Sequence, residues 1–146
     1  MEKRPVTVVR PGEKKRMTRN PGEGFVYFVT GKQTGGNYFL LEALIPPGGG
    51  PSPHIQTRED EGFYMLEGEL VFTADGEAIT ATAGMFINVP ENVVHSFKNE
   101  SGKNARMLII FAPAGMENFF GEMALNPANA AAIAEKYGVQ LVNGPV

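Results

Sequence analysis

Short runs of apolar and β-branched residues, separated by glycine, proline or asparagine, dominate the chain from residue 25 to residue 111. Such runs predict β-strands, because branched and aromatic side chains fit the pleated surface of a sheet. Short strands at this spacing indicate a mainly β fold, either a sandwich or a barrel. The predicted strands are residues 25–30, 37–45, 62–66, 69–73, 77–82, 85–89, 93–98 and 105–111.

Two dipeptides between these runs predict tight hairpins. Glu67-Gly68 separates residues 62–66 from 69–73, and Asp75-Gly76 separates 69–73 from 77–82. Glycine in the second position supplies the left-handed backbone that a two-residue hairpin turn requires. We therefore expect both connections to join antiparallel neighbours.

The pattern changes after Pro113, where helical spacing and alanine predict two helices, at residues 116–124 and 128–137. A chain of 146 residues has the size of one domain. We expect a single domain over residues 1–146. It would comprise N-terminal strands and loops (1–36), a core barrel (37–112) and a C-terminal helical segment (113–146).

Composition narrows the chemistry that is available. The chain has no cysteine, which excludes disulfides and thiolate metal sites, and its only histidines are His54 and His95. The net charge of −3 argues against general binding to nucleic acid. No run has the length and apolarity of a signal peptide or a membrane span, so we expect a soluble cytoplasmic protein with no membrane partner.

The N-terminal region is basic, because residues 1–19 hold seven of the thirteen lysines and arginines. A solvated edge strand and loop is the simpler interpretation of such a run. Contact with an anion or a partner is the alternative. The basic residues are Lys3, Arg4, Arg10, Lys14, Lys15, Arg16 and Arg19.

The two histidines stand in chemically informative surroundings. His54 and Gln56 are two residues apart, so on a strand their side chains share a face, and Glu61 follows after a short polar turn. The turn, Arg58-Glu59-Asp60, is predicted to be solvated. His95 lies within a predicted strand and shares its face with Phe97.

The spacing of these residues resembles the two motifs of the cupin superfamily, G-x5-H-x-H-x3,4-E-x6-G and G-x5-P-x-G-x2-H-x3-N. Two positions depart from the family pattern: Gln56 replaces a histidine, and Asn92 replaces a glycine, which asparagine can do because it tolerates left-handed backbone. We interpret Asn99 as a turn residue or as support for a ligand. The matching residues are Gly48, His54, Glu61 and Gly68, then Gly84, Pro90, His95 and Asn99.

The resemblance implies a double-stranded β-helix, or jelly-roll barrel, that binds a divalent transition metal: iron, manganese, nickel, cobalt, copper or zinc. The implied ligands are His54, Glu61 and His95, with Gln56 as a weak fourth ligand or a hydrogen-bonding group. The alternative is a site that has lost its metal, whose polar groups bond to each other or to water. Phe63, Met65 and Phe97 share strand faces with these residues and are candidate walls of a substrate pocket; core packing is the equal alternative.

Within the superfamily, the proline- and glycine-rich segment before the first motif and the C-terminal helix look like the quercetin 2,3-dioxygenase-like cupins. That resemblance implies metal-dependent insertion of dioxygen into a small aromatic or flavonol-like substrate, with Glu61 as both ligand and general base. It also implies a homodimer. Two alternatives stay open: a barrel that binds a small molecule without turnover, and a redox-neutral isomerase or lyase.

Overall fold

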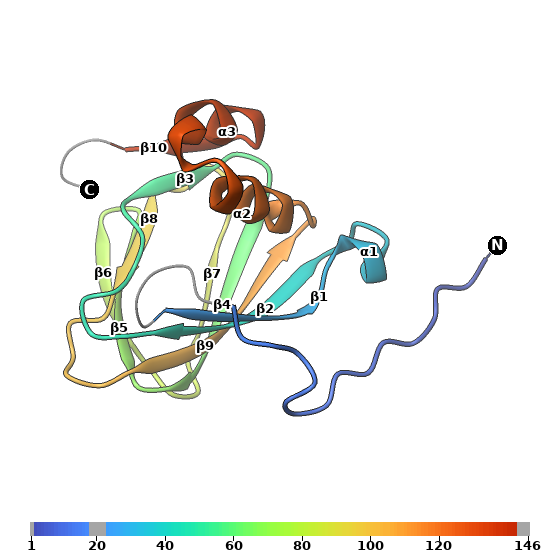
Figure 1. Cartoon of the computed structure of the whole chain (residues 1–146). Coiled ribbons are helices and arrows are strands. Elements are labelled where there is room, and N and C mark those ends of the chain that lie inside the picture. Colours follow the sequence, from blue (N-terminus) through green and yellow to red (C-terminus); the bar gives the residue numbers. More distant parts are fainter. Residues whose placement is uncertain (1, 18–22, 143–146) are drawn as a thin grey trace.

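Ten β-strands form two antiparallel five-stranded sheets in the computed structural model, which describes residues 2–17 and 23–142 (Figure 1). Sheet A has the order β1 (Gly24–Val29), β2 (Phe39–Ile45), β9 (Ala105–Ala112), β4 (Asp60–Glu67) and β7 (Phe86–Val89). Sheet B has the order β10 (Val139–Leu141), β3 (His54–Gln56), β8 (His95–Lys98), β5 (Glu69–Ala74) and β6 (Glu77–Thr82). The two sheets face each other as a jelly-roll barrel, so the mainly β fold predicted from the sequence is confirmed.

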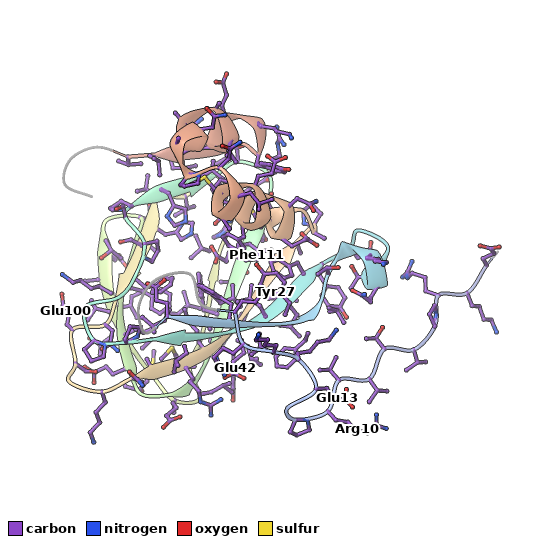
Figure 2. All side chains as sticks on the ribbon, viewed as in Figure 1. Arg10, Glu13, Tyr27, Glu42, Glu100 and Phe111 are labelled. Atoms are coloured by element: carbon purple, nitrogen blue, oxygen red, sulfur yellow. The ribbon has the colours of Figure 1, made fainter. Side chains whose placement is uncertain are left out.

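Strict alternation along the central strands places the core between the sheets. In β2, Phe39, Leu41, Ala43 and Ile45 are buried, while the intervening residues are partly exposed. β9 repeats the pattern, and its last buried residue is Phe111 (Figure 2). The Phe111 ring stacks on Phe39 with ring centroids 5.7 Å apart. A period of two is what a strand with one buried face requires.

One of the two predicted hairpins is correct and the other is wrong. β5 and β6 pair directly through Asp75 and Gly76, both with positive φ. At Gly68 the chain instead passes from sheet A to sheet B, because β4 pairs with β7 and β9 and β5 pairs with β6 and β8. A Cβ on Gly68, whose φ is 79°, would lie 2.7 Å from the Asn104 carbonyl oxygen. The corner thus needs glycine for the same backbone freedom as a hairpin, so the two turns look alike in sequence.

Two C-terminal helices, α2 (Met116–Leu125) and α3 (Ala130–Lys136), lie over one end of the barrel, beside β3 (Figure 1). A short 3₁₀ turn, η1 (Pro127–Asn129), joins them, and β10 then returns to pair with β3. The first turn of α2 is fixed to the barrel because Glu117 Oε2 accepts a hydrogen bond from the backbone N–H of Gly31, at 2.7 Å. The predicted helices are confirmed, with α3 shorter than expected.

Three short elements were not predicted: β3, β10 and the helix α1 (Gly31–Thr34). Each has only three or four residues, too few to show a hydrophobic period. α1 is held by a capping box in which Thr30 and Gln33 exchange side-chain and backbone bonds.

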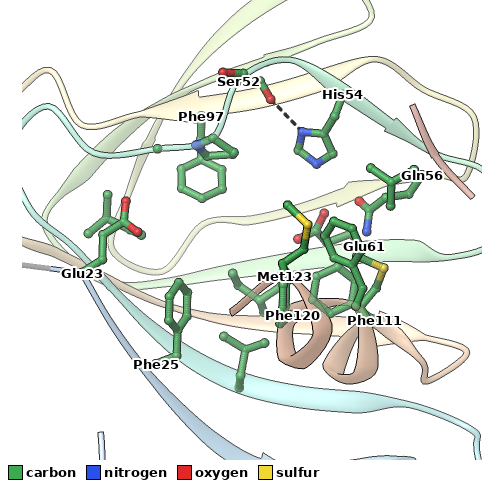
Figure 3. Close-up of a pocket in the computed structure, with 18 of the residues that line it drawn as sticks. Glu23, Phe25, Ser52, His54, Gln56, Glu61, Phe97, Phe111, Phe120 and Met123 are labelled. Carbon is green, nitrogen blue, oxygen red and sulfur yellow. Dashed lines mark hydrogen bonds between the residues drawn. The ribbon is translucent and has the colours of Figure 1, made fainter. Parts of the chain in front are cut away.

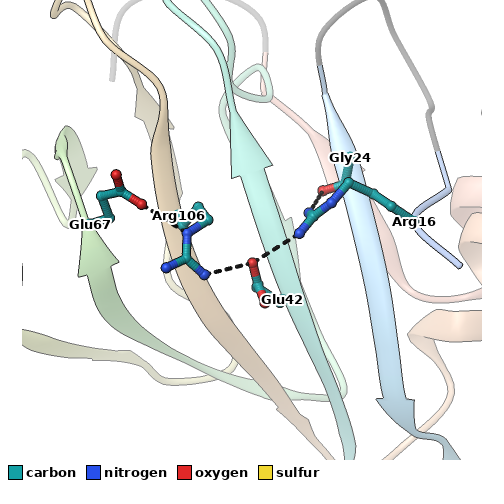
Figure 4. A network of polar contacts seen from close by, with 5 residues as sticks. All are labelled: Arg16, Gly24, Glu42, Glu67 and Arg106. Atoms are coloured by element: carbon teal, nitrogen blue, oxygen red, sulfur yellow. Dashed lines mark hydrogen bonds and ion pairs between the residues drawn. The ribbon is translucent and has the colours of Figure 1, made fainter. Parts of the chain in front are cut away.

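The N-terminal segment forms almost no regular structure. Within residues 2–17 only Met17 makes a β-bridge, to Phe25, so an edge strand exists there in one residue alone. Arg19 lies outside the described residues. Arg16 forms an ion pair with Glu42 at 3.0 Å. Arg106 forms ion pairs with both Glu42 and Glu67, so the network crosses the outer face of sheet A (Figure 4). Among the described residues, no helix is long and apolar enough to cross a bilayer.

Candidate metal centre

Pairing between strands of sheet B brings the two histidines together. β3 and β8 meet in one register pair, His54 opposite His95, and the centroids of the two rings are 4.4 Å apart. Glu61 reaches the same point from β4 in sheet A, and its Oε1 lies 3.0 Å from His95 Nε2. One ligand atom from each of the three residues falls within 4.8 Å of the others. The predicted cluster of His54, Glu61 and His95 is therefore assembled across both sheets.

Backbone carbonyls orient both imidazole rings. His54 Nδ1 lies 2.9 Å from the Ser52 carbonyl oxygen (Figure 3), and His95 Nδ1 lies 2.9 Å from the Val93 carbonyl oxygen. Donation from each Nδ1–H leaves Nε2 as the atom available to a metal. In both contacts the carbonyl belongs to the residue two positions before the histidine. The start of each strand therefore sets the orientation of its imidazole ring.

Burial controls the protonation of the cluster. Burial, together with the charge of His95, lowers the pKa of His54 to about 4, so its imidazole is neutral at pH 7. Burial raises the pKa of Glu61 despite its bond to His95. For His95, burial acts to lower the pKa. The hydrogen bond and charge of Glu61 outweigh this effect, so the pKa of His95 is raised. One proton is thus held between Oε1 and Nε2, where a metal ion would replace it.

Gln56 is buried beside the cluster, with 3% of its surface exposed, and its Oε1 has no hydrogen-bond partner. Its backbone is fixed by pairing with Val139 and by the Asn92 N–H, 2.8 Å from the Gln56 carbonyl oxygen. An unpaired buried carbonyl oxygen costs about 1–3 kcal/mol unless something binds it. The orphaned oxygen, two imidazoles and one carboxylate form a donor set that fits a divalent transition metal and leaves coordination positions open.

The two other motif residues have structural positions. Asn92 adopts a φ of 70°, the left-handed backbone expected where the family motif has glycine. Asn99 is buried, and its Nδ2 donates hydrogen bonds to the Ile45 and Lys103 carbonyl oxygens, which stabilises a turn. Among the described residues, no hydrogen bond joins Asn99 to the cluster.

His54, Gln56 and Glu61 line a cavity of about 300 Å³, while His95 lies buried behind them. Figure 3 shows Gln56 and Glu61 on one side of it and Phe25 with Glu23 on the other. Most of the remaining lining is apolar, and α2 contributes four residues at helical spacing: Met116, Phe119, Phe120 and Met123. The space suits a small ligand with an apolar, planar body and a polar group directed at the cluster.

The predicted wall residues separate into two groups. Phe97 lines the cavity. Phe63 and Met65 are each 1% exposed and lie in the core rather than among the lining residues of this cavity; Phe63 packs on Phe72 with ring centroids 4.9 Å apart. Strand alternation fixes which side of β4 faces inward, but not how deep each inward residue lies.

Two features of this region were not predicted. Met116 and Met123 complete a helical face with Phe119 and Phe120, and their i, i+3, i+4, i+7 spacing is the signal that could have found them. Glu59, predicted in a solvated turn, is 5% exposed, and its Oε2 has no partner. Burial raises the pKa of Glu59 to about 7.

Comparison with known proteins agrees with this geometry. Residues 41–111 match the family model described as "Cupin domain". The chain is 33% identical over 89 residues to quercetin 2,3-dioxygenase of Bacillus subtilis (strain 168). This alignment covers 61% of this chain and 26% of that protein. It is 30% identical over 85 residues to polyketide synthase CurC of Streptomyces cyaneus, which covers 58% of this chain and 55% of that protein. The matches thus span about half or less of these relatives.

Among solved structures, KdgF from Halomonas sp. superimposes with a TM-score of 0.70 at 15% identity, over 78% of this chain and 99% of that one. At this identity the likeness concerns the fold.

Proposed function

The chain is a member of the cupin superfamily, and we propose that it is a metal-dependent dioxygenase acting on a small aromatic, flavonol-like substrate. The proposal rests on the His54–Glu61–His95 cluster, of which His54 and Glu61 line an apolar cavity of about 300 Å³. The 33% identity to a quercetin 2,3-dioxygenase supports the choice of substrate class.

The metal would be held by His54 Nε2, His95 Nε2 and a Glu61 carboxylate oxygen. Gln56 Oε1 would be the fourth ligand atom beside it. A bound divalent transition metal supplies Lewis acidity and, if redox-active, a route for electrons to dioxygen. Iron, manganese, nickel, cobalt, copper and zinc all accept imidazole and carboxylate ligands.

The protein's own groups would bind the substrate and handle its proton. Glu61 is the base: its raised pKa suits removal of an acidic phenolic or enolic proton at a carboxylate oxygen. Phe97 and Phe120 line the cavity and would pack against an aromatic ligand.

A second candidate is a redox-neutral reaction on a similar ligand, with the metal acting only as a Lewis acid. Gln56 favours it, because an amide oxygen binds transition metals more weakly than the imidazole that the family motif has there. The 30% identity to a protein named as a polyketide synthase is compatible with it. A third candidate, also compatible with Gln56, is a barrel that binds its ligand without turnover.

Oxygen uptake separates these functions. The full chain is loaded with each of the six metals and mixed with quercetin, while dissolved oxygen and the quercetin absorbance are followed together. The dioxygenase predicts that one oxygen is consumed for each quercetin lost, and that His54→Ala abolishes both signals while Glu135→Gln, on an exposed position of α3, changes neither.

Loss of quercetin without oxygen uptake would support the redox-neutral candidate. Quercetin binding with no reaction in any metal would support the binding barrel. No binding of quercetin by the metal-loaded chain would overturn the proposed substrate class.

A further inference from the structure

The cavity beside the cluster has a second acidic side chain on its far side. Glu23 lines the cavity together with Phe25, and Figure 3 shows both residues opposite Gln56 and Glu61. Glu23 is partly buried and comes directly before β1. Residues two apart in an extended chain share a face, which explains why the side chains of Glu23 and Phe25 both line the cavity.

The chain is held in place immediately after Glu23. Phe25 and Met17 exchange two backbone hydrogen bonds, of 2.7 and 2.8 Å, and Phe25 also pairs with Ala43 of β2. The ring of Phe25 stacks on that of Phe120, with ring centroids 6.4 Å apart. The start of β1 therefore presents Glu23 at a fixed place on the cavity wall.

The two ends of the cavity differ in charge. The ionisable side chains among the lining residues that the structure describes are Glu23, His54 and Glu61, with no lysine or arginine. A divalent ion beside neutral imidazoles and one carboxylate leaves the cluster end with a net positive charge. Glu23 gives the other end a negative charge. A ligand would therefore direct an electron-rich oxygen at the cluster and a donor group at Glu23.

The chemistry of a carboxylate restricts the group that it can bind. Its two oxygens accept several hydrogen bonds, so Glu23 can bind a ligand donor while it also contacts another group of the chain. A phenolic hydroxyl or an ammonium group donates to such an oxygen, whereas a carboxylate or phosphate of the ligand is repelled. Most of the remaining lining is apolar, so this contact distinguishes ligands of similar shape.

We propose that Glu23 is a specificity-determining residue, which selects a hydrogen-bond donor at the end of the ligand distant from the metal cluster and rejects an anionic group there. The inference rests on the proposed function and refines its substrate class. The preferred flavonol carries a hydroxyl on the ring that reaches Glu23. Glu23 orients the ligand and takes no part in the reaction at the cluster.

Binding of matched flavonols to the full chain tests the role of Glu23. The probes are 3-hydroxyflavone and its derivatives with one further hydroxyl, at position 7 or at position 4′, which are the two ends of the molecule. The chain is treated with Zn²⁺, a redox-inactive ion, so that the ligand is not consumed, and fluorescence titration gives the affinities. One of the added hydroxyls should tighten binding to the wild type about five- to tenfold.

Two variants separate Glu23 from the rest of the chain. In Glu23→Ala the gain from the added hydroxyl should fall below about twofold, because the acceptor is gone. Glu135→Ala, which removes an exposed carboxylate of α3, is the matched control and should keep the full gain. The metal content of both variants should equal that of the wild type.

Reversing the charge should reverse the preference. The analogue with a carboxylate in place of the favoured hydroxyl should bind the wild type poorly and bind Glu23→Lys at least about tenfold more tightly. A damaged fold cannot produce such a gain.

Equal affinity of the wild type for all three flavonols would overturn the role of Glu23, as would a gain that persists in Glu23→Ala. Either result leaves the dioxygenase proposal standing, because oxygen uptake is measured separately. A gain that depends on Glu23, in a chain that consumes no oxygen, would support the inference and contradict the dioxygenase. If no flavonol binds, the inference falls together with the proposed substrate class.

Discussion

The cavity has two walls that are built by different kinds of structure. The polar wall, His54, Gln56 and Glu61 with His95 behind, comes from β3, β4 and β8, whose positions are set by strand register and backbone hydrogen bonds. The apolar wall, Met116, Phe119, Phe120 and Met123, is one face of α2, which is fastened at its first turn by Glu117. Strands from both sheets hold the ligand atoms of the cluster within 4.8 Å of one another. The side chains with which α2 lines the cavity can be changed without moving these atoms. Under the proposed function, the polar wall would set the chemistry and the apolar wall the choice of ligand.

Removing a ligand from the polar wall should have the largest effect. His54→Ala deletes one of two imidazoles, so metal affinity should fall by more than about 100-fold, beyond the loss typical of the groups that merely support a ligand. Titration with Co²⁺, followed by absorbance and calorimetry, measures the change. Met123→Ala, on the apolar wall, is the control and should bind the metal as the wild type does. Equal losses in both variants would mean that the walls do not act separately.

The proton shared by the polar wall should make metal binding depend on pH. Burial raises the pKa of Glu61, and Glu61 raises the pKa of His95, so the metal must displace a proton held between them. Affinity should rise with pH by up to about tenfold per unit while that proton remains bound. His54, with a pKa lowered to about 4, adds no proton between pH 6 and 8. Calorimetry in buffers of different ionisation enthalpy should detect about one proton released per metal; a pH-independent affinity would contradict the shared proton.

A change on the apolar wall should alter ligand binding alone. Phe120→Leu keeps apolar volume but removes a ring, which is worth about 0.5–1.5 kcal/mol in aromatic contacts, so quercetin affinity should fall about two- to tenfold. Metal content should be unchanged. Fluorescence titration of the metal-loaded variant measures the first quantity and elemental analysis the second. A loss of metal in this variant would show that α2 supports the cluster as well as the ligand.

The smallest effect concerns Glu59, a second buried carboxyl close to Glu61. Burial raises the pKa of Glu59 from its ordinary value of 4.5 to about 7. Between those pH values the folded chain keeps a proton that the unfolded chain has lost, so stability falls as pH rises through this range and stays low above it. Glu59→Gln should therefore stabilise the protein at pH 8 by on the order of 1 kcal/mol and have little effect at pH 4.

Thermal unfolding at the two pH values measures this difference, with Glu135→Gln on α3 as the exposed control. A gain of equal size at both pH values would mean that charge burial at Glu59 is not the cause.

Much of the polar wall could be predicted from the sequence, because its spacing is local. His54 and Gln56 share a face by alternation, and the distances along the chain from Gly48 to Gly68 and from Gly84 to Asn99 carry the motifs. The contact between His54 and His95 could not be derived in the same way, since β3 and β8 meet in a single register pair. A single pair leaves no hydrophobic period to read.

The rest depended on long-range packing. Gly68 serves a corner between sheets, and its requirement for positive φ is shared with the hairpin that was predicted there. Phe63 and Met65 point inward as predicted but lie in the core and not on the cavity wall, because depth depends on residues from other strands. Glu59 looked solvated among charged neighbours, yet the fold buries it.

The metal content of the purified chain shows whether His54, Glu61 and His95 form a metal centre. Untagged protein is incubated with each transition metal, passed through gel filtration and analysed for metal per chain, beside His54→Ala treated in the same way. We expect close to one ion per chain in the wild type and almost none in the variant. A wild-type chain that stays empty with every metal, or a variant that retains as much as the wild type, would contradict a metal centre built from His54, Glu61 and His95.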